Sequence, residues 1–178
     1  MVAVLYPMTK ASAATMGDQR SRGMTQEDLE AAWRAHYPAL VRRLTIVVGD
    51  PHEGEDLAQT TFERALGALD RFQGDDVRGW LYTIGMRLAI NERRRRLRLH
   101  EFLTRLQPDP AFIDVDPDLW KALHALDRRT RAAIVLSVLD GYRYQEIATM
   151  LDVPAGTIGS WITRGKASLR ATLGDGDP

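Results

Sequence analysis

The chain has 178 residues and a mass of 20.0 kDa, so it can form one ordinary domain or two small ones, and a large barrel or a long doubly wound sheet is disfavoured. Hydrophobic residues make up 44% and charged residues 27%, which is a globular composition, and the absence of cysteine excludes disulfides, cysteine zinc sites and thiol nucleophiles. Because 24 basic residues balance 24 acidic ones, a nucleic-acid-binding function has to be argued from where the charges lie.

The N-terminal residues carry no clear structural signal. Residues 1–24 show neither a basic leader nor an apolar segment of signal-peptide length, and we interpret them as a flexible extension. No stretch approaches the roughly 20 apolar residues that span a bilayer, so we expect no membrane insertion and a cytoplasmic location. Regular structure is predicted to begin at Thr25, a hydroxyl N-cap followed three residues later by Asp28, in a helix that runs to about Gly49.

Two further helices are predicted in the first half of the chain. Apolar residues at helical spacing indicate one helix from about His52 to Leu69 and another from about Trp80, which continues into the basic tract at 92–98. Residues 50–76 hold eight acidic side chains against two arginines, whereas residues 78–98 hold seven arginines against one glutamate. This segregation suits an acidic helix for a basic protein partner and a basic helix for phosphates, although a solvated face explains the arginines equally well.

A linker is predicted at residues 99–118, where three prolines and several acids interrupt the apolar periodicity. Helical periodicity resumes at Leu119 and continues to Leu139, and Asp140-Gly141 ends it. The expected fold is therefore all-α, with two small helical domains, residues 25–98 and residues 119–173, joined by a flexible linker and followed by a short tail at 174–178.

Residues 142–170 have the spacing of a helix-turn-helix. A short helix from Tyr144 to about Leu151 is followed by a turn at Asp152-Val153, and Pro154 suits the first turn of the second helix. The predicted inward positions are Ile147, Ala148, Leu151, Ile158, Ile162 and Leu169. The predicted outward positions of the second helix are Thr157, Ser160, Trp161 and Arg164, with Lys166 and Arg170 further on. A plain helical hairpin would show the same apolar pattern, so the pattern alone leaves that alternative open.

The basic helix also carries groups that suit exposed bases. Trp80, Arg87 and Asn91 lie on one helical stripe, where an aromatic ring could stack on a base and an amide could bond a base edge. Taken alone, Trp80 is more typical of a core residue. The chain has no GxxxxGK[ST] loop and no HExxH motif, and its four histidines are scattered, so we expect no enzyme, no metal and no cofactor.

Three segments together resemble the extracytoplasmic-function (ECF) sigma factors, over about residues 25–173. DPHEGEDLAQTTFERALGALDRF resembles their polymerase-binding segment, RGWLYTIGMRLAINERRRR their −10-reading and melting segment, and GYRYQEIATMLDVPAGTIGSWITRGKASLR their −35-reading helix-turn-helix. The three motifs stand in the family's order and are separated by a linker of family length. Together they are far more specific than any one of them.

The resemblance implies a role for individual residues. A segment that docks on the β′ clamp helices of RNA polymerase is matched by Asp56, Leu57, Gln59, Phe62 and Arg64. The implied −10 DNA-binding residues are Arg78, Trp80, Arg87, Asn91, Arg94 and Arg95, and the implied −35 DNA-binding residues are Thr157, Ser160, Trp161, Thr163, Arg164 and Lys166. Arg87 stands where many members have asparagine, while Gly159 replaces the usual lysine or arginine and Trp161 the usual arginine, which predicts weaker or altered −35 binding.

The function expected from this resemblance is that of an ECF-type sigma factor that binds core RNA polymerase through the β′ clamp helices and the β subunit and directs it to promoter DNA. An anti-sigma factor is a further partner of the kind the family uses, and the sequence leaves its existence open. Two alternatives also remain: a helix-turn-helix regulator that acts without polymerase, and a sigma-like protein-interaction module. The acidic helix joined to a basic helix favours the first interpretation, because a simple repressor has no use for that pair.

Overall fold

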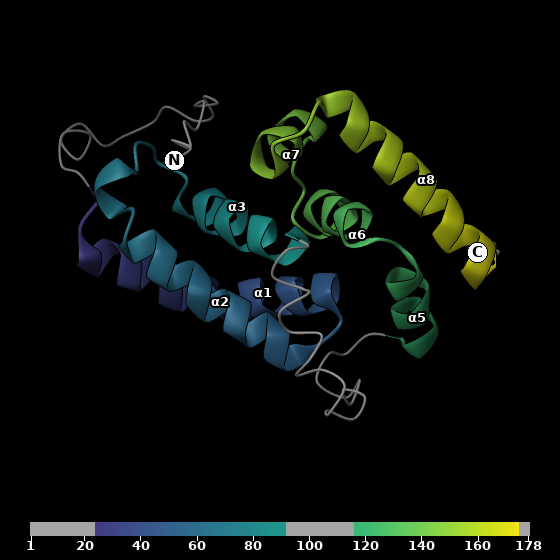
Figure 1. Ribbon diagram of the computed structural model, residues 1–178, viewed down its shortest axis with the longest axis horizontal. Coiled ribbons are helices and arrows are strands. Elements are labelled where there is room, and N and C mark those ends of the chain that lie inside the picture. Colours follow the sequence, from purple (N-terminus) through teal and green to yellow (C-terminus); the bar gives the residue numbers. More distant parts are fainter. Residues whose placement is uncertain (1–23, 92–115, 175–178) are drawn as a thin grey trace.

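A computed structural model describes residues 24–91 and 116–174, and within these ranges all regular structure is helical (Figure 1). This confirms the all-α expectation. The elements are α1 (Gln26–Val48), α2 (Pro51–Leu66), η1 (Leu69–Arg71), α3 (Val77–Ile90), α5 (Pro117–Ala125), α6 (Arg128–Ile134), η3 (Val135–Leu139), α7 (Tyr144–Leu151) and α8 (Ala155–Leu173). We call α1 to α3 the first lobe and α5 to α8 the second lobe.

The first helix begins and ends where the sequence predicts. The Thr25 hydroxyl accepts a hydrogen bond from the Asp28 amide at 3.2 Å, and the Asp28 carboxylate accepts one from the Thr25 amide at 3.0 Å, which is a capping box. The helix stops at Gly49, whose φ of +90° lies in the left-handed region that glycine adopts without strain. A Cβ at Gly49 would also lie 2.9 Å from the His124 ring, so the second lobe approaches this turn closely.

The second and third helices differ from their predicted bounds. α2 ends at Leu66, before the predicted Leu69, and a short 3₁₀ turn follows at η1. α3 begins at Val77, three residues before Trp80, because the Asp76 carboxylate caps it by accepting from the Gly79 amide at 2.7 Å. At its other end Asn91 has left helical geometry, with φ −76° and ψ 105°. The predicted continuation of this helix into residues 92–98 lies outside the described residues.

The second lobe breaks a segment that the sequence presented as continuous. α5 begins at Pro117, inside the predicted linker, because the Asp116 carboxylate accepts from the amides of Asp118 and Leu119 at 2.8 and 3.0 Å. The chain then leaves the helix at Leu126, and Asp127 caps a new one, α6. The expectation of unbroken helix from 119 to 139 is therefore wrong. An aspartate cap interrupts the helix without the glycine or proline that usually signals such a break.

The helix-turn-helix is present with the predicted bounds. α7 ends at Leu151 and is capped by Asp152, whose φ is +58°, and α8 begins at Ala155. Pro154 is the N-cap of α8 instead of lying in its first turn. Five of the six predicted inward side chains are buried and the sixth is partly buried, in the order Ile147, Ala148, Leu151, Ile158, Ile162 and Leu169. α8 also crosses α6 at Gly165, where a Cβ would lie 2.6 Å from a methyl carbon of Ile134.

The two lobes pack against each other in this structure. One cluster of buried side chains contains Leu44, Tyr82 and Met86 from the first lobe together with Ile147 and Met150 from the second. In Figure 1 the teal helix α3 lies between α1 and α2 on one side and α6 and α7 on the other. A smaller cluster around Leu29, Ala65, Trp80 and Leu81 belongs to the first lobe alone. Sequence periodicity did not predict the shared core.

Candidate nucleic-acid interface

The residues of α8 that the sequence predicts to face outward differ in their exposure. Ser160, Thr163 and Arg164 are exposed, while Thr157, Trp161 and Lys166 are partly buried. The Ser160 hydroxyl donates to the Gly156 carbonyl at 2.9 Å, and the Arg164 guanidinium donates to the Ser160 carbonyl at 3.3 Å. These bonds stay within the helix. The face can therefore exchange them for contacts to DNA without disrupting the fold.

Trp161 behaves as an apolar residue. Its ring packs against the core shared by the two lobes and lines a pocket, so only part of it is exposed. Gly159, two residues earlier, has space around it: a Cβ there would lie 3.8 Å from the Tyr144 ring, which is an ordinary contact. Packing therefore does not require glycine at this position of α8.

The predicted −10-reading residues on α3 lie in contrasting environments. Trp80 is 8% exposed, and its ring lies 4.7 Å from that of Phe72, which confirms the core alternative for this residue. As placed, it offers no face on which a base could stack. Asn91 is exposed at the end of the helix. Arg94 and Arg95 lie outside the described residues.

Arg78 and Arg87 are both engaged by the second lobe. Arg78 donates to the Asp140 carboxylate at 2.7 Å, and its guanidinium carbon lies 5.1 Å from the centre of the Tyr82 ring and 5.7 Å from that of Tyr142. Arg87 donates to the backbone carbonyl of Met150 at 2.7 Å and to that of Thr149 at 2.9 Å. Two cations predicted to read DNA are thus used in contacts between the lobes.

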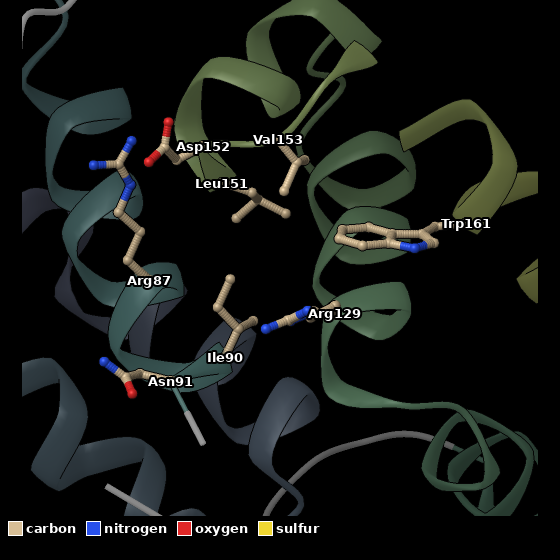
Figure 2. A pocket seen from close by; sticks show the side chains of 8 residues that line it. All are labelled: Arg87, Ile90, Asn91, Arg129, Leu151, Asp152, Val153 and Trp161. Atoms are coloured by element: carbon tan, nitrogen blue, oxygen red, sulfur yellow. The ribbon is translucent and has the colours of Figure 1, made fainter. Parts of the chain in front are cut away.

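A pocket of about 460 Å³ brings predicted −10 and −35 residues together. Figure 2 shows α3 residues along one side and the end of α7, its turn and Trp161 of α8 along the other. The eight lining residues are Arg87, Ile90, Asn91, Arg129, Leu151, Asp152, Val153 and Trp161. Two of the predicted −10 residues, Arg87 and Asn91, therefore share a pocket with one of the predicted −35 residues, Trp161.

The predicted polymerase-docking residues divide between surface and core. Asp56, Gln59 and Arg64 are exposed on α2. Leu57 is only 1% exposed and holds α2 against the core, while Phe62 packs on the Trp33 ring at 5.0 Å. Asp56 and Gln59 are three residues apart and share a face, so the surface that α2 offers to a partner is polar and acidic.

Sequence analysis missed a set of charged residues between the lobes. The Asp140 side chain is 0% exposed and accepts from Arg78 and from Arg43, the latter at 3.3 Å. Arg128 donates to both carboxylate oxygens of Glu53, at 3.0 and 3.1 Å, and to the Val48 carbonyl at 3.3 Å. These partners are separated by 62 to 97 residues, so no local pattern could have indicated them.

Arg131 and His124 also lie where the two lobes meet, near the end of α1. Arg131 donates to the carbonyls of Ile46 and Leu126, and burial, followed by repulsion from Arg128, lowers its pKa to about 10. The His124 ring nitrogen Nδ1 lies 2.8 Å from the Trp120 carbonyl, and burial followed by the positive charge of Arg131 lowers its pKa. α1 has no basic residue in its own last turn. Cations from the second lobe therefore face its partly negative C-terminus.

Two further searches covered the described ranges, 24–91 and 116–174. No group of three or more histidine, cysteine or acidic side chains there could hold a metal ion. None of the described helices is both long enough and apolar enough to cross a membrane.

Comparison with known proteins identifies relatives of both lobes. The Sigma-70 region 2 family matches residues 32–99, and the Sigma-70, region 4 family matches residues 117–169. The chain is 34% identical over 152 residues to the ECF RNA polymerase sigma factor SigE of Mycolicibacterium smegmatis, covering 79% of this chain and 59% of that protein. It is 30% identical over 148 residues to the ECF RNA polymerase sigma factor EcfG of Rhodopseudomonas palustris, covering 78% of this chain and 81% of that protein.

Two solved structures have a similar fold. The sigma factor RpoE of Bartonella quintana, crystallised with the anti-sigma factor NepR, aligns with a TM-score of 0.68 at 25% identity, covering 85% of this chain and 99% of that one. CnrH, solved in complex with the cytosolic domain of CnrY, aligns with a TM-score of 0.61 at 25% identity, covering 86% and 92% of the two chains.

Proposed function

Because the chain belongs to the family of ECF RNA polymerase sigma factors, we propose that it binds core RNA polymerase and directs it to promoters. The observation that carries this proposal is the match of region 2 and region 4 in order along one chain. A polymerase-independent regulator would need only the second of these. The chain acts by binding and carries out no catalytic chemistry of its own.

In this proposal each lobe has a separate task. Residues 25–98 bind core polymerase and read the −10 element, and residues 119–173 read the −35 element. Residues 99–118 connect them, and residues 1–24 and 174–178 are the N-terminal extension and the tail. The polymerase acts in the cytoplasm, so we place the chain there as well.

Recognition of the −35 element depends on α8. Its exposed Arg164 can bond the O6 and N7 atoms of guanine in the major groove, and Ser160 can bond a base or a phosphate. Trp161 has one donor and no charge, so we assign it an apolar or stacking role. The −10 element is read by α3, where Asn91 can bond the edge of an unstacked base.

A regulatory partner is also part of the proposal. The solved structure of RpoE contains an anti-sigma factor, and this chain shares its fold. An anti-sigma factor for this chain would have to engage surfaces that polymerase or DNA otherwise uses.

In vitro transcription with core polymerase, with and without this chain, on a genomic promoter library tests the proposal. We expect a defined set of transcripts that require the chain. Binding to duplex DNA without any new transcript would favour the polymerase-independent regulator. Failure to bind either DNA or polymerase would favour the interaction module.

A further inference from the structure

We propose that the pocket of about 460 Å³ binds a free nucleoside monophosphate whose base carries an amino group. Arg129 of α6 holds the phosphate, and Asp152, in the turn between α7 and α8, accepts a hydrogen bond from the amino group. The base lies against the ring of Trp161 on α8. Such binding goes beyond the proposed function, because it requires neither polymerase nor promoter DNA.

The pocket has the size and the composition of a small-molecule site. Sites of this kind commonly enclose about 300–1,000 Å³ and combine apolar walls with a few polar groups that orient the ligand. The apolar walls of this pocket are formed by Ile90, Leu151, Val153 and Trp161. Its polar and charged side chains are those of Arg87, Asn91, Arg129 and Asp152. A ligand that suits it needs an apolar surface together with groups that bond to charges.

Two of the charged side chains that line the pocket are available to a ligand. Within the described ranges, no hydrogen bond or ion pair engages the Arg129 guanidinium or the Asp152 carboxylate, and both residues are exposed. These opposite charges line one pocket without pairing with each other. Arg87 differs from them, since its guanidinium donates to the backbone carbonyls of Met150 and Thr149.

The two available charges lie on different sides of the pocket. In Figure 2, Asp152 lies at its upper side and the Arg129 guanidinium at its lower side, with Leu151 and Trp161 between them in height. An anion without any donor group would be attracted by Arg129 and repelled by Asp152. A ligand that satisfies both has a negative group at one end and a hydrogen-bond donor at the other.

Trp161 indicates what joins the two ends of the ligand. Its ring packs against the shared core of the two lobes, so packing fixes its position, and part of it still lines the pocket. Nucleobases stack on aromatic side chains held in this way next to a positive charge. The middle of the ligand is therefore a flat aromatic ring.

A nucleoside monophosphate combines these three features. Its phosphate carries a charge of about −1.5 to −2 at neutral pH, and an arginine can donate two parallel hydrogen bonds to it. Adenine and cytosine each present an exocyclic amino group, which an aspartate can accept from. Because Asp152 repels a phosphate, the base end of the nucleotide lies toward Asp152 and the phosphate toward Arg129.

Isothermal titration calorimetry of the full chain with AMP tests the site. We expect saturable binding at a single site. Purine riboside 5′-monophosphate differs from AMP in lacking the amino group, and it should bind about tenfold more weakly, because the bond to Asp152 is lost. Adenosine lacks the phosphate and should also bind about tenfold more weakly or worse.

Two substitutions remove the available charges, and a third is their control. Arg129→Gln changes an exposed residue, and glycine in Asp152→Gly adopts the φ of +58° without strain, so the fold should persist in both. Each variant should bind AMP about tenfold more weakly. Asp152→Gly should also lose the preference for AMP over purine riboside 5′-monophosphate. Arg42→Gln, at an exposed arginine of α1 that does not line the pocket, should bind AMP normally.

The signals of the indole N–H groups show where AMP binds. The chain has four tryptophans, and the indole signal that is missing from the nuclear magnetic resonance spectrum of Trp161→Leu belongs to Trp161. AMP should shift this signal in the wild-type chain more than it shifts the others.

Absence of saturable AMP binding to the full chain would overturn the proposal. Equal affinity of the wild type and Arg129→Gln for AMP would also overturn it, as would equal affinity of the wild type for AMP and purine riboside 5′-monophosphate, because the two charges would then have no role. Binding of a single-stranded tetranucleotide without binding of AMP would assign the pocket to DNA and would likewise overturn it.

Discussion

At the scale of single residues, Arg164 is the side chain that we expect to carry −35 specificity. Its guanidinium is exposed on α8 and is bonded only weakly, at 3.3 Å, to its own helix. A bidentate contact from arginine to guanine discriminates against a wrong base by about 1–3 kcal/mol. Arg164→Ala should therefore flatten the response of transcription to −35 substitutions when holoenzyme is assayed on a promoter series.

The matched control for that experiment is Arg170→Ala, an exposed arginine six residues further along the same helix. A phosphate contact carries no sequence information, so this variant should weaken all promoters alike and reduce the salt dependence of binding. If Arg164→Ala behaves in the same uniform way, Arg164 is a phosphate contact and another residue reads the −35 bases.

Two glycines of α8 should respond in opposite ways to alanine. A Cβ at Gly159 would make only ordinary contacts with the Tyr144 ring. Gly159→Ala should therefore raise the free energy of unfolding by up to about 1 kcal/mol, because alanine has the higher helix propensity. A Cβ at Gly165 would lie 2.6 Å from Ile134 and 2.7 Å from Thr130, so Gly165→Ala should destabilise the fold by about 1–3 kcal/mol. Urea unfolding of the two full-length variants measures both changes, and the same sign for both would contradict the packing described for α6 and α8.

At the scale of elements, the exposed face of α2 should bind core polymerase. Asp56→Arg reverses a charge on this face without touching the buried Leu57, so the fold should persist while affinity for core polymerase falls about tenfold or more. Co-purification with core enzyme measures the loss, and circular dichroism verifies the helix content. Asp70→Arg, the same change at an exposed position of η1, should bind normally. Unchanged co-purification of Asp56→Arg would place the docking surface elsewhere.

How well each element could be predicted depended on whether its signals were local. The capping box at Thr25 and the spacing of Ile147, Leu151 and Ile158 lie within a few residues of one another, so both α1 and the helix-turn-helix were predictable. The break between α5 and α6 was not, because no glycine or proline marks it; it depends on the Asp127 side chain, which accepts from the amides of Arg129 and Thr130 and so caps α6. On α8, Ser160 and Arg164 are exposed as the helical spacing predicts, whereas Trp161 packs against the core.

At the scale of the whole molecule, the contacts between the lobes could not be predicted from the sequence. Asp140 was interpreted only as a helix-ending residue, yet it pairs with arginines 62 and 97 positions away. Arg78 and Arg87 are assigned to DNA from the family pattern, and in the structure both donate hydrogen bonds to the second lobe. Periodicity reports which side of a helix is buried, and it does not report against which partner.

His124, which lies where the two lobes meet, makes the stability of the fold depend on pH. Its ring lies against the turn at Gly49, near the Ile46 carbonyl of α1, and the charged groups that face it are Arg131 and Arg128 of α6. Burial and then the charge of Arg131 lower its pKa from 6.5. The pKa of the nearby Asp127 carboxyl is also shifted: burial opposes the shift, but hydrogen bonds from Thr130 and Arg129 lower the pKa from 3.8. Its contribution to stability therefore changes only in more acidic solution.

We therefore expect the chain to lose stability as the solution is acidified from about pH 7 to about pH 5.5. The unfolded chain takes up a proton on His124 near its ordinary pKa of 6.5, whereas the folded chain resists protonation. The stabilisation from neutral His124 is thus complete above its pKa in the unfolded chain, and it is lost as the pH falls toward its lower pKa in the folded chain. His124→Phe keeps a ring against Trp120 and cannot be protonated, so its midpoint of thermal unfolding should change less over this range. His52→Gln alters an exposed histidine and should follow the wild type; equal slopes for the wild type and His124→Phe would exclude His124 as the source of the pH dependence.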